Sequence, residues 1–487
     1  MSSPITAEEF IRRAAAGPGT LTVGVVTPVQ TQFFEAVFGP EVPAAAKPAV
    51  YTRPADSAQL QHLVRCTAEG GWSIWRTLSV SGSGASAGHP DRPGVFVDLS
   101  DMKQILALDP GSATALVEPG VTFAELRAHL AAGGHPFWLD CGPNAADSVA
   151  GSILDRALGE TPYGDRLLMQ CGFEICDGRG ELLRTGMGAL PGNNTWQLFK
   201  YNFGPYLDGL YSGDGYGLPT KAGFWIMPAP PHFHPFMVTL PDDGSLAAAV
   251  ELLRPLKIGM ALPGTVSVNH IDAEAALIER ASPEQTPDFV GLMQDGQLNT
   301  WNLYGAFYGL PDNVALLWDS LLPGLHALPG SRVFTDAEGR EDAIWQLHRD
   351  LLRGAPAYSR PATALKGQLW FTVAGGLEGE DVRRMRAAGA GPLSEYGIKA
   401  LTDFQLGWRT LFYRVGIDYD AHDFSAKRDV LLHVSRLLAE QGFAVSHACP
   451  ALRGALSRQQ TSPALSRLYA GIGEGLDPAG IFGPAHG

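Results

Sequence analysis

The sequence lacks the short patterns that mark several common classes of protein. Its five cysteines form neither a Cys-x-x-Cys pair nor a haem-attachment motif. We therefore expect small buried thiols and no metal site. No apolar run reaches the roughly 18 residues needed to span a bilayer, and residues 1–13 lack the charged and apolar regions of a signal peptide. These absences predict a cytoplasmic protein without a membrane partner.

Positive charge is also scarce. The 487 residues include 50 acidic and 36 basic side chains, which give a formal net charge of -14. Because no Lys/Arg cluster stands out against this background, nucleic acid is not an expected partner. The hydrophobic fraction is 45%, enough to bury a substantial core. A chain of this length predicts two domains, or one large domain with an inserted cap.

Helical and strand patterns divide the chain near Pro228. Before it, helices are expected at 7–16, 58–68 and 122–130, strands at 95–99 and 115–119, and a Gly/Ser loop at 78–88. After it, strands are expected at 232–240, 300–308, 367–373 and 410–415, alternating with helices at 245–256, 312–321, 381–388 and 426–441. The first part reads as an α+β half-domain. The second predicts an antiparallel sheet covered on one face by helices.

A run of motifs occupies the stretch from Gly151 to Pro228. In order, they are Asp155-Arg156, Thr161–Asp165, Arg184–Gly188, Pro191–Trp196, Phe203–Asp208, Gly215–Gly223 and Trp225–Pro228. Taken in this order, they resemble the p-cresol methylhydroxylase and vanillyl-alcohol oxidase group of FAD enzymes, and the resemblance extends from about Tyr51 to Pro484. It implies an α+β fold, with a two-part FAD-binding domain of the p-cresol methylhydroxylase type and an inserted cap of antiparallel sheet plus helices. The implied parts are 1–228, the cap 229–440, and a segment 441–487 that returns to the FAD-binding domain.

The resemblance implies which residues bind FAD. The loop Ser81–Ser86 matches the position where backbone amides hold the pyrophosphate, and glycine lets the backbone approach an anion closely. Asp155-Arg156 and Tyr163–Asp165 match a second flavin-binding region, and Gly217–Thr220 matches the segment along the isoalloxazine edge. The implied cofactor-binding residues are Ser81, Gly82, Ser83, Gly84, Ala85, Ser86, Pro119, Gly120, Gly151, Ser152, Arg156, Tyr163, Gly164, Asp165, Gly217, Leu218, Pro219 and Gln368.

The chain departs from this group where the group binds phenols and anchors its flavin. The group's Tyr-Arg pair falls on Ser446-His447, and its early Tyr falls in Gly82–Ala85, which contains no aromatic ring. Without these phenolate donors, we expect the substrate not to be a simple para-alkylphenol. Members with a histidyl flavin carry His where this chain has Gln368, so we expect FAD to be bound without a covalent bond. A tyrosyl link through Tyr358 is the open alternative.

Two other residues are candidates for catalysis. Asp403 matches an acidic position in the group's cap strand, and a neighbouring His position is Phe412 here. Asp403 and His447 could together act as acid and base across the flavin. The alternative is that Asp403 is a solvated loop carboxylate and His447 a hydrogen-bonded strand residue.

The resemblance implies an FAD-dependent oxidoreductase that transfers a hydride from a small organic substrate to flavin N5. Two other functions stay open. One is a catalytically degenerate homologue that serves as a binding partner or scaffold, since the phenolate donors are missing. The other is an electron-transfer flavoprotein subunit that docks an electron-acceptor protein. A homodimer is a further partner that the resemblance leaves open.

Overall fold

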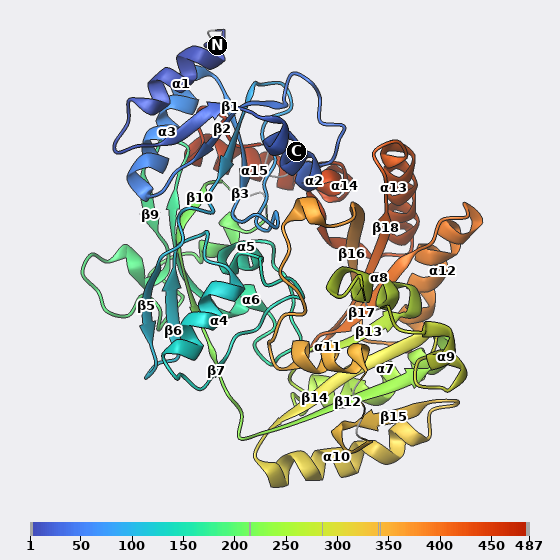
Figure 1. The fold of residues 1–487 in the computed structure, drawn as a ribbon. Coiled ribbons are helices and arrows are strands. Elements are labelled where there is room, and N and C mark those ends of the chain that lie inside the picture. Colours follow the sequence, from blue (N-terminus) through green and yellow to red (C-terminus); the bar gives the residue numbers. More distant parts are fainter. Residues whose placement is uncertain (1–2, 214–215, 285, 339, 341, 484–487) are drawn as a thin grey trace.

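The computed structural model describes residues 3–213, 216–284, 286–338, 340 and 342–483. Gly215 and Pro484, which bound two of the expected segments, lie outside these residues. The chain forms an N-terminal domain of two sheets and a cap built on one large sheet (Figure 1). Within the described residues, no helix is both long and apolar enough to cross a bilayer.

The N-terminal domain places two sheets against a shared core. One sheet has the order β1-β2-β4-β3, with β3 and β4 parallel, and the other has the order β5-β6-β10-β8-β9. The strands of the first sheet are β1 (Thr22–Val25), β2 (Pro48–Arg53), β3 (Ser73–Thr77) and β4 (Gly94–Asp98). The strands of the second are β5 (Ile105–Asp109), β6 (Thr114–Val117), β8 (Gln170–Cys176), β9 (Leu182–Arg184) and β10 (Leu218–Trp225). A short pair, β7 (Phe137–Trp138) and β11 (Met227–Pro228), stands beside them.

Helices with strong caps surround this core. They are α1 (Ala7–Ala15), α2 (Pro28–Phe38), α3 (Ser57–Gly70), α4 (Phe123–Ala132), α5 (Val149–Leu154) and α6 (Arg166–Met169). Thr122 and Glu125 form a capping box at the start of α4, which confirms the helix expected there. Helix α3 begins one residue earlier than expected. The reason is that the carboxylate of Asp56, rather than the hydroxyl of Ser57, accepts a hydrogen bond from the free amide of Gln59.

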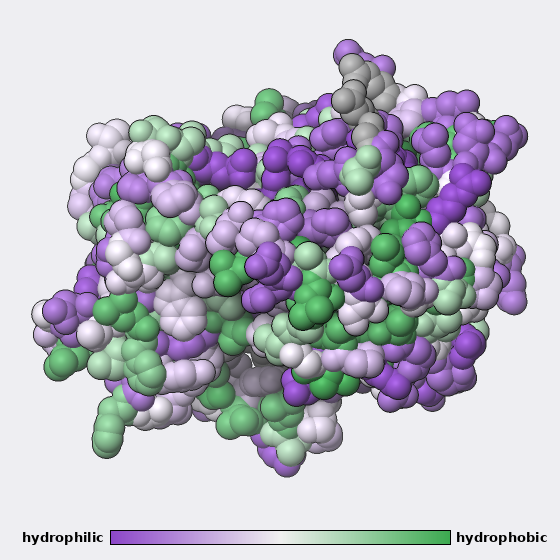
Figure 2. All heavy atoms as spheres, turned by 90° about the horizontal axis from the view of Figure 1, so that it is seen from below, coloured by the Kyte–Doolittle hydropathy of each residue, from purple (hydrophilic) through white to green (hydrophobic). Residues whose placement is uncertain are grey.

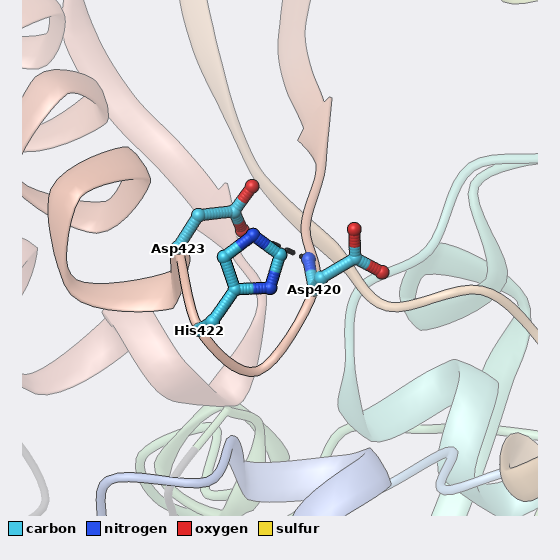
Figure 3. Close-up of side chains that lie close together, drawn as sticks. All are labelled: Asp420, His422 and Asp423. Carbon is cyan, nitrogen blue, oxygen red and sulfur yellow. Dashed lines mark hydrogen bonds between the residues drawn. The ribbon is translucent and has the colours of Figure 1, made fainter.

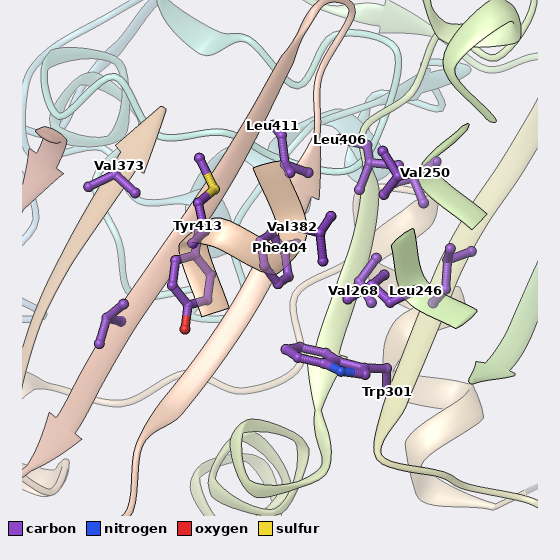
Figure 4. Close-up of a cluster of buried hydrophobic side chains, with 14 of the residues drawn as sticks. Leu246, Val250, Val268, Trp301, Val373, Val382, Phe404, Leu406, Leu411 and Tyr413 are labelled. Carbon is purple, nitrogen blue, oxygen red and sulfur yellow. The ribbon is translucent and has the colours of Figure 1, made fainter. Parts of the chain in front are cut away.

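The cap is an eight-stranded antiparallel sheet with the order β15-β12-β14-β13-β17-β18-β16-β19. Its strands are β12 (His232–Leu240), β13 (Val266–His270), β14 (Trp301–Gly309), β15 (Arg332–Thr335), β16 (Gln368–Gly376), β17 (Leu401–Leu406), β18 (Thr410–Asp418) and β19 (Ala444–Ala448). Successive side chains point to opposite faces, so Phe404, Leu406, Leu411 and Tyr413 share one buried apolar face, shown in Figure 4 with Trp301 beside them.

Helices cover that apolar face as the sequence predicted. They are α7 (Asp243–Ile258), α10 (Pro311–His326), α12 (Gly379–Glu395) and α13 (Phe424–Glu440). Helices also lie on the opposite face, which corrects the expectation that only one face is covered. There α8 (Ile271–Ala281), α9 (Phe289–Gln294) and α11 (Ala343–Leu352) bury Met237, Tyr304 and Ala306. The sequence does not predict these three helices, because short helices carry weak periodic signals.

The end of the chain contributes to both domains. Strand β19 and helix α14 (Pro450–Gln460) lie beyond the predicted boundary at residue 440, yet they pack with the cap sheet. Helix α15 (Pro463–Leu476) follows, and Ile481 and Phe482 then enter the core of the N-terminal domain. The predicted boundaries at 228/229 and 440/441 stay predictions, and this packing favours moving the second one beyond α14.

The surface and the cysteines agree with the composition. Polar and apolar residues are interspersed on the face seen in Figure 2. Cys66, Cys141, Cys171, Cys176 and Cys449 are all free and buried, so the expectation of small buried thiols is confirmed.

Replacing Ile481 by Ala should destabilise the N-terminal domain. The Ile481 side chain is fully buried, and its carbonyl accepts a 2.8 Å hydrogen bond from the amide of Ile74 in β3. Truncating a buried Ile leaves a cavity and costs about 2–5 kcal/mol. The measurement is urea unfolding followed by circular dichroism. Leu468→Ala, at a site in α15 that is 58% exposed, is the control and should leave the midpoint unchanged; equal shifts for both variants would contradict the assignment.

Candidate functional site

A cavity of about 800 Å³ lies between the N-terminal domain and the open part of the cap sheet. One wall contains the Gly/Ser loop and the segment that links α5 to α6. The other wall is the face of β13 and β16–β19 that the helices leave uncovered, and α14 and α15 border one end. The cavity therefore joins the two regions in which the sequence placed cofactor and substrate residues.

The Gly/Ser loop presents hydroxyl groups to this cavity. Ser81, Gly82, Ser83 and Ala85 line it, and the Ser79 hydroxyl lies 2.7 Å from that of Ser81 and 2.9 Å from that of Ser83. Such a cluster can turn its protons toward an anion.

Close backbone packing fixes the shape of this loop. Gly84 has φ +66°, and a Cβ there would lie 2.8 Å from the Cα of Gly151. The amide of Gly84 donates to Asp155 over 2.7 Å, and that of Ser86 to the carbonyl of Arg76 over 3.1 Å. Gly84, Ser86 and Gly151 thus shape the loop without lining the cavity.

Arg156 adds a positive charge to the same wall. It lines the cavity in a left-handed conformation, φ 52°, which a residue with a side chain adopts at a cost. Its Nε donates to the Ser212 hydroxyl over 2.9 Å. The nearby Ser152 also lines the cavity and accepts from Arg166 over 2.7 Å.

The remaining implied cofactor residues lie outside the cavity wall. Leu218 is buried in the core, and the carbonyl of Gly217 accepts from Arg76 over 2.6 Å. Asp165 caps α6, and the carbonyl of Gly164 accepts from Gly159. For these positions and for Pro119, Gly120, Tyr163 and Pro219, a direct flavin contact stays a prediction.

The cap strands align the other candidate residues in one row across the sheet. The pairing runs from Asn269 in β13 to Asp403 in β17, then to Arg414 in β18, Thr372 in β16 and His447 in β19. All five line the cavity. Three strand spacings of about 4.8 Å separate Asp403 from His447. They therefore belong to one wall but do not form a directly hydrogen-bonded pair.

Asp403 is a buried, paired carboxylate rather than a solvated loop residue. It lies in β17 and is 6% exposed, and its Oδ2 accepts from the Nε of Arg414 over 2.6 Å. Burial raises the pKa of Asp403, while Arg414 acts in the opposite direction. The pair presents a fixed dipole to the cavity.

His447 is electrically neutral at physiological pH. Burial and the positive charges of Arg156 and Arg453 lower its pKa to about 4. Its Nδ1 lies 3.0 Å from the Ser446 hydroxyl, and its buried Nε2 has no hydrogen-bond partner among the described residues. His447 can therefore donate or accept a hydrogen bond, but it does not change charge near pH 7.

A second polar group in the cavity was missed from the sequence. Glu160 precedes the Thr161–Asp165 motif, and its Oε1 accepts from the Ser267 hydroxyl over 2.9 Å. His348 lines the same region and lies 2.5 Å from Glu274. Glu160 could have been noticed as the acidic neighbour of the motif. The sequence contains no pattern that predicts the Glu274–His348 pair, because helical side chains 74 residues apart meet only in the folded chain.

Exposed side chains near β18 could also hold a metal ion in principle. Asp420, His422 and Asp423 cluster in the turn before α13 (Figure 3). Asp423 is already engaged, because it pairs with Lys427 over 2.7 Å and accepts from the amide of Asp420. None of these three residues lines the cavity described above.

The residues that line the cavity suit FAD in their chemistry. Serine hydroxyls and Arg156 can hold a diphosphate, and the cavity extends from them to the cap sheet. Gln368 lies on this wall, and its amide donates to Asp418 over 3.3 Å.

Comparisons with known proteins agree with this arrangement. Residues 48–186 match the family described as FAD binding domain. The chain is 30% identical over 458 residues to the 4-cresol dehydrogenase [hydroxylating] flavoprotein subunit of Pseudomonas putida, covering 91% of this chain and 88% of the other. A crystal structure of p-cresol methylhydroxylase with substrate bound has a TM-score of 0.87 at 27% identity and covers 98% of this chain and 95% of that one. A 4-ethylphenol oxidase from Gulosibacter chungangensis has a TM-score of 0.86 at 23% identity, covers 99% and 98%, and shows the same fold. The chain therefore belongs to the p-cresol methylhydroxylase group of FAD-linked oxidoreductases.

Proposed function

We propose that this protein transfers a hydride from an organic substrate to FAD, and that the substrate is not a simple para-alkylphenol. The observation that carries the proposal is the cavity itself, which connects a serine-rich loop suited to a diphosphate with a row of polar side chains on the cap sheet. When bound, FAD supplies the hydride-accepting chemistry.

The chain's own residues would bind and orient the reactants. The hydroxyls of Ser81 and Ser83 and the guanidinium of Arg156 would hold the diphosphate. The Asp403–Arg414 pair would orient a polar group of the substrate, while the neutral His447 would exchange a hydrogen bond with it. Helix α14 and the Gly/Ser loop border the cavity and would limit the access of water.

The proposal includes FAD held without a covalent bond. Gln368 stands where the resemblance places a flavin-linking His, and an amide is not a nucleophile. Tyr358 also lines the cavity, but burial raises the pKa of its hydroxyl above the ordinary value and disfavours the phenolate.

Acid precipitation should release the flavin into the supernatant. The result is expected because neither Gln368 nor Tyr358 offers a reactive group under ordinary conditions. The measurement is the flavin absorbance of pellet and supernatant, followed by fluorescence of the denatured chain on a gel. A pellet that remains yellow would overturn non-covalent binding, and the Tyr358→Phe variant would then identify or exclude the tyrosyl link.

Gly84→Ala should reduce the affinity for FAD. The added Cβ would lie 2.8 Å from the Cα of Gly151, so the loop that would contact the diphosphate must shift. Gly134→Ala is a matched control, because Gly134 also has a positive φ, +63°, but has nothing within 4 Å of its Cβ position. The measurement is the dissociation constant of FAD after reconstitution. Equal affinities for the two variants would contradict the assignment of this loop.

Simple para-alkylphenols should reduce the flavin slowly. Losing one oxyanion donor typically costs about 10²–10³ in rate, and Ser446 and the neutral His447 replace the expected Tyr-Arg pair. Anaerobic stopped flow with p-cresol, beside the Pseudomonas putida flavoprotein subunit, measures this. Reduction as fast as in that relative would refute the proposal. The Ser446→Tyr, His447→Arg double variant should be faster, and complete reduction by dithionite is the control for a competent flavin.

The acceptor, the location and the alternative function also belong to this proposal. The Pseudomonas putida relative is a dehydrogenase flavoprotein subunit and the Gulosibacter relative is an oxidase, so both a protein acceptor and dioxygen are to be tested with the reduced enzyme.

We place the protein in the cytoplasm and keep a homodimer as a proposal. A catalytically inactive scaffold is less well supported, because buried polar groups along a cavity cost desolvation energy.

A further inference from the structure

Glu160 is held rigidly at the edge of the cavity. It lies between Gly159 and Thr161, and a Cβ on Gly159 would overlap the Asp140 carboxylate. The same carboxylate accepts from the amide of Thr161 over 3.0 Å and from its hydroxyl over 2.7 Å. Both neighbours of Glu160 are thus fixed against Asp140, and its side chain reaches across the cavity to Ser267 in β13.

One oxygen of this carboxyl group lacks a partner. Oε1 accepts from Ser267, whereas the buried Oε2 has no hydrogen-bond partner among the described residues. The side chain as a whole is half-buried because it borders the cavity. The terminal torsion of Glu is broad, so a small rotation would turn Oε2 toward a ligand.

The other charged groups facing Glu160 are already paired. The carboxylates with a cationic partner are Asp140 with Arg166 at 2.9 Å, Glu274 with His348 at 2.5 Å, Asp403 with Arg414 at 2.6 Å, and Asp342 with Arg340. Although burial opposes it, Glu274 holds the pKa of His348 above its ordinary value, which favours the charged imidazole. The hydroxyl of nearby Tyr308 donates to the carbonyl of Leu352 over 2.6 Å.

Glu160 differs from Glu274 and Asp403, which each have a cationic partner. Among the described residues, Glu160 forms no ion pair, and the cavity-lining cations Arg280 and Lys366 pair with Asp418 instead. Burial raises the pKa of Glu160 to about 7, although His348 and Ser267 act in the opposite direction. A buried carboxylate without a counter-ion is costly, and a cationic ligand would remove that cost.

We propose that this end of the cavity binds a positively charged amino group of the substrate, with the Glu160 carboxylate as its counter-ion. Trp370, Phe412 and Tyr358 line the same cavity and offer aromatic surface for the body of such a molecule. The inference rests on the proposed function only in treating this cavity as the substrate site. It names the substrate class as a primary or secondary amine carried on an apolar or aromatic frame.

A pair of probes that differ in one group tests this inference. 2-Phenylethylamine carries an ammonium group where 2-phenylethanol carries a hydroxyl. Binding of each to the oxidised holoenzyme is measured by calorimetry, with the flavin spectrum as a second signal. At pH 8 the amine should bind at least about tenfold more tightly than the alcohol. This preference should shrink toward pH 6, because Glu160 is ionised above its pKa of about 7 and protonated below it, whereas the ammonium stays charged throughout.

The variant Glu160→Gln should remove that preference while keeping the fold. Losing one partner of a buried charged hydrogen bond costs at least about 30-fold in affinity. Amine binding should weaken by that factor and lose its dependence on pH, and alcohol binding should change little. Glu279→Gln is the matched control, since Glu279 is an exposed residue of α8. FAD content and circular dichroism confirm that each variant is folded.

Three outcomes would overturn the inference. They are equal binding of the two probes by the wild type, amine affinity independent of pH between 6 and 8, and no calorimetric binding of the amine. If Glu160→Gln fails to fold, the wild-type comparison at two pH values still decides. Failure of the proposed oxidoreductase function looks different: the amine would bind as expected, yet no electron donor except dithionite would reduce the flavin.

Discussion

The strict alternation of side chains in the eight-stranded cap sheet determines the site. Because successive residues point to opposite faces, Phe404, Leu406 and Tyr413 enter the apolar core while Asp403 and Arg414 face the cavity. A shift of one residue in the register would exchange the two sets. The burial of the apolar face under four helices therefore fixes which polar groups face the cavity.

The N-terminal domain supplies the second wall by close backbone packing. Gly84 and Gly151 approach each other too closely for a side chain on either, and Asp140 holds the turn that carries Glu160. Buried, hydrogen-bonded carboxylates such as Asp140 are costly unless paired, and Arg166 provides the partner. The loops that line the cavity are thus held in place by contacts with the buried core rather than by contacts with solvent.

Much of this could be predicted from the sequence, and the reasons for the failures are physical. Long periodic segments such as 232–240 and 426–441 were found because their patterns are strong, and the motif run from Gly151 identified the family. The helices α8 and α11 were missed, since they are short and their apolar residues serve a second face of the sheet. Asp403 and His447 both line the cavity, but only the strand register shows that they stand three strands apart. The lowered pKa of His447 follows from burial and from neighbours distant in the chain, which one sequence cannot reveal. The same holds for the missing counter-ion of Glu160.

The Glu160 carboxyl faces the cavity without a counter-ion among the described residues, and its buried Oε2 has no hydrogen-bond partner there. Infrared difference spectroscopy of the wild-type holoenzyme against Glu160→Gln, between pH 5 and 9, follows its protonation directly. We expect a carboxylic acid that ionises near pH 7, and the transition should move to lower pH when 2-phenylethylamine is present, since a bound cation favours the carboxylate. A transition near the ordinary value of about 4.3, unaffected by the amine, would contradict this expectation.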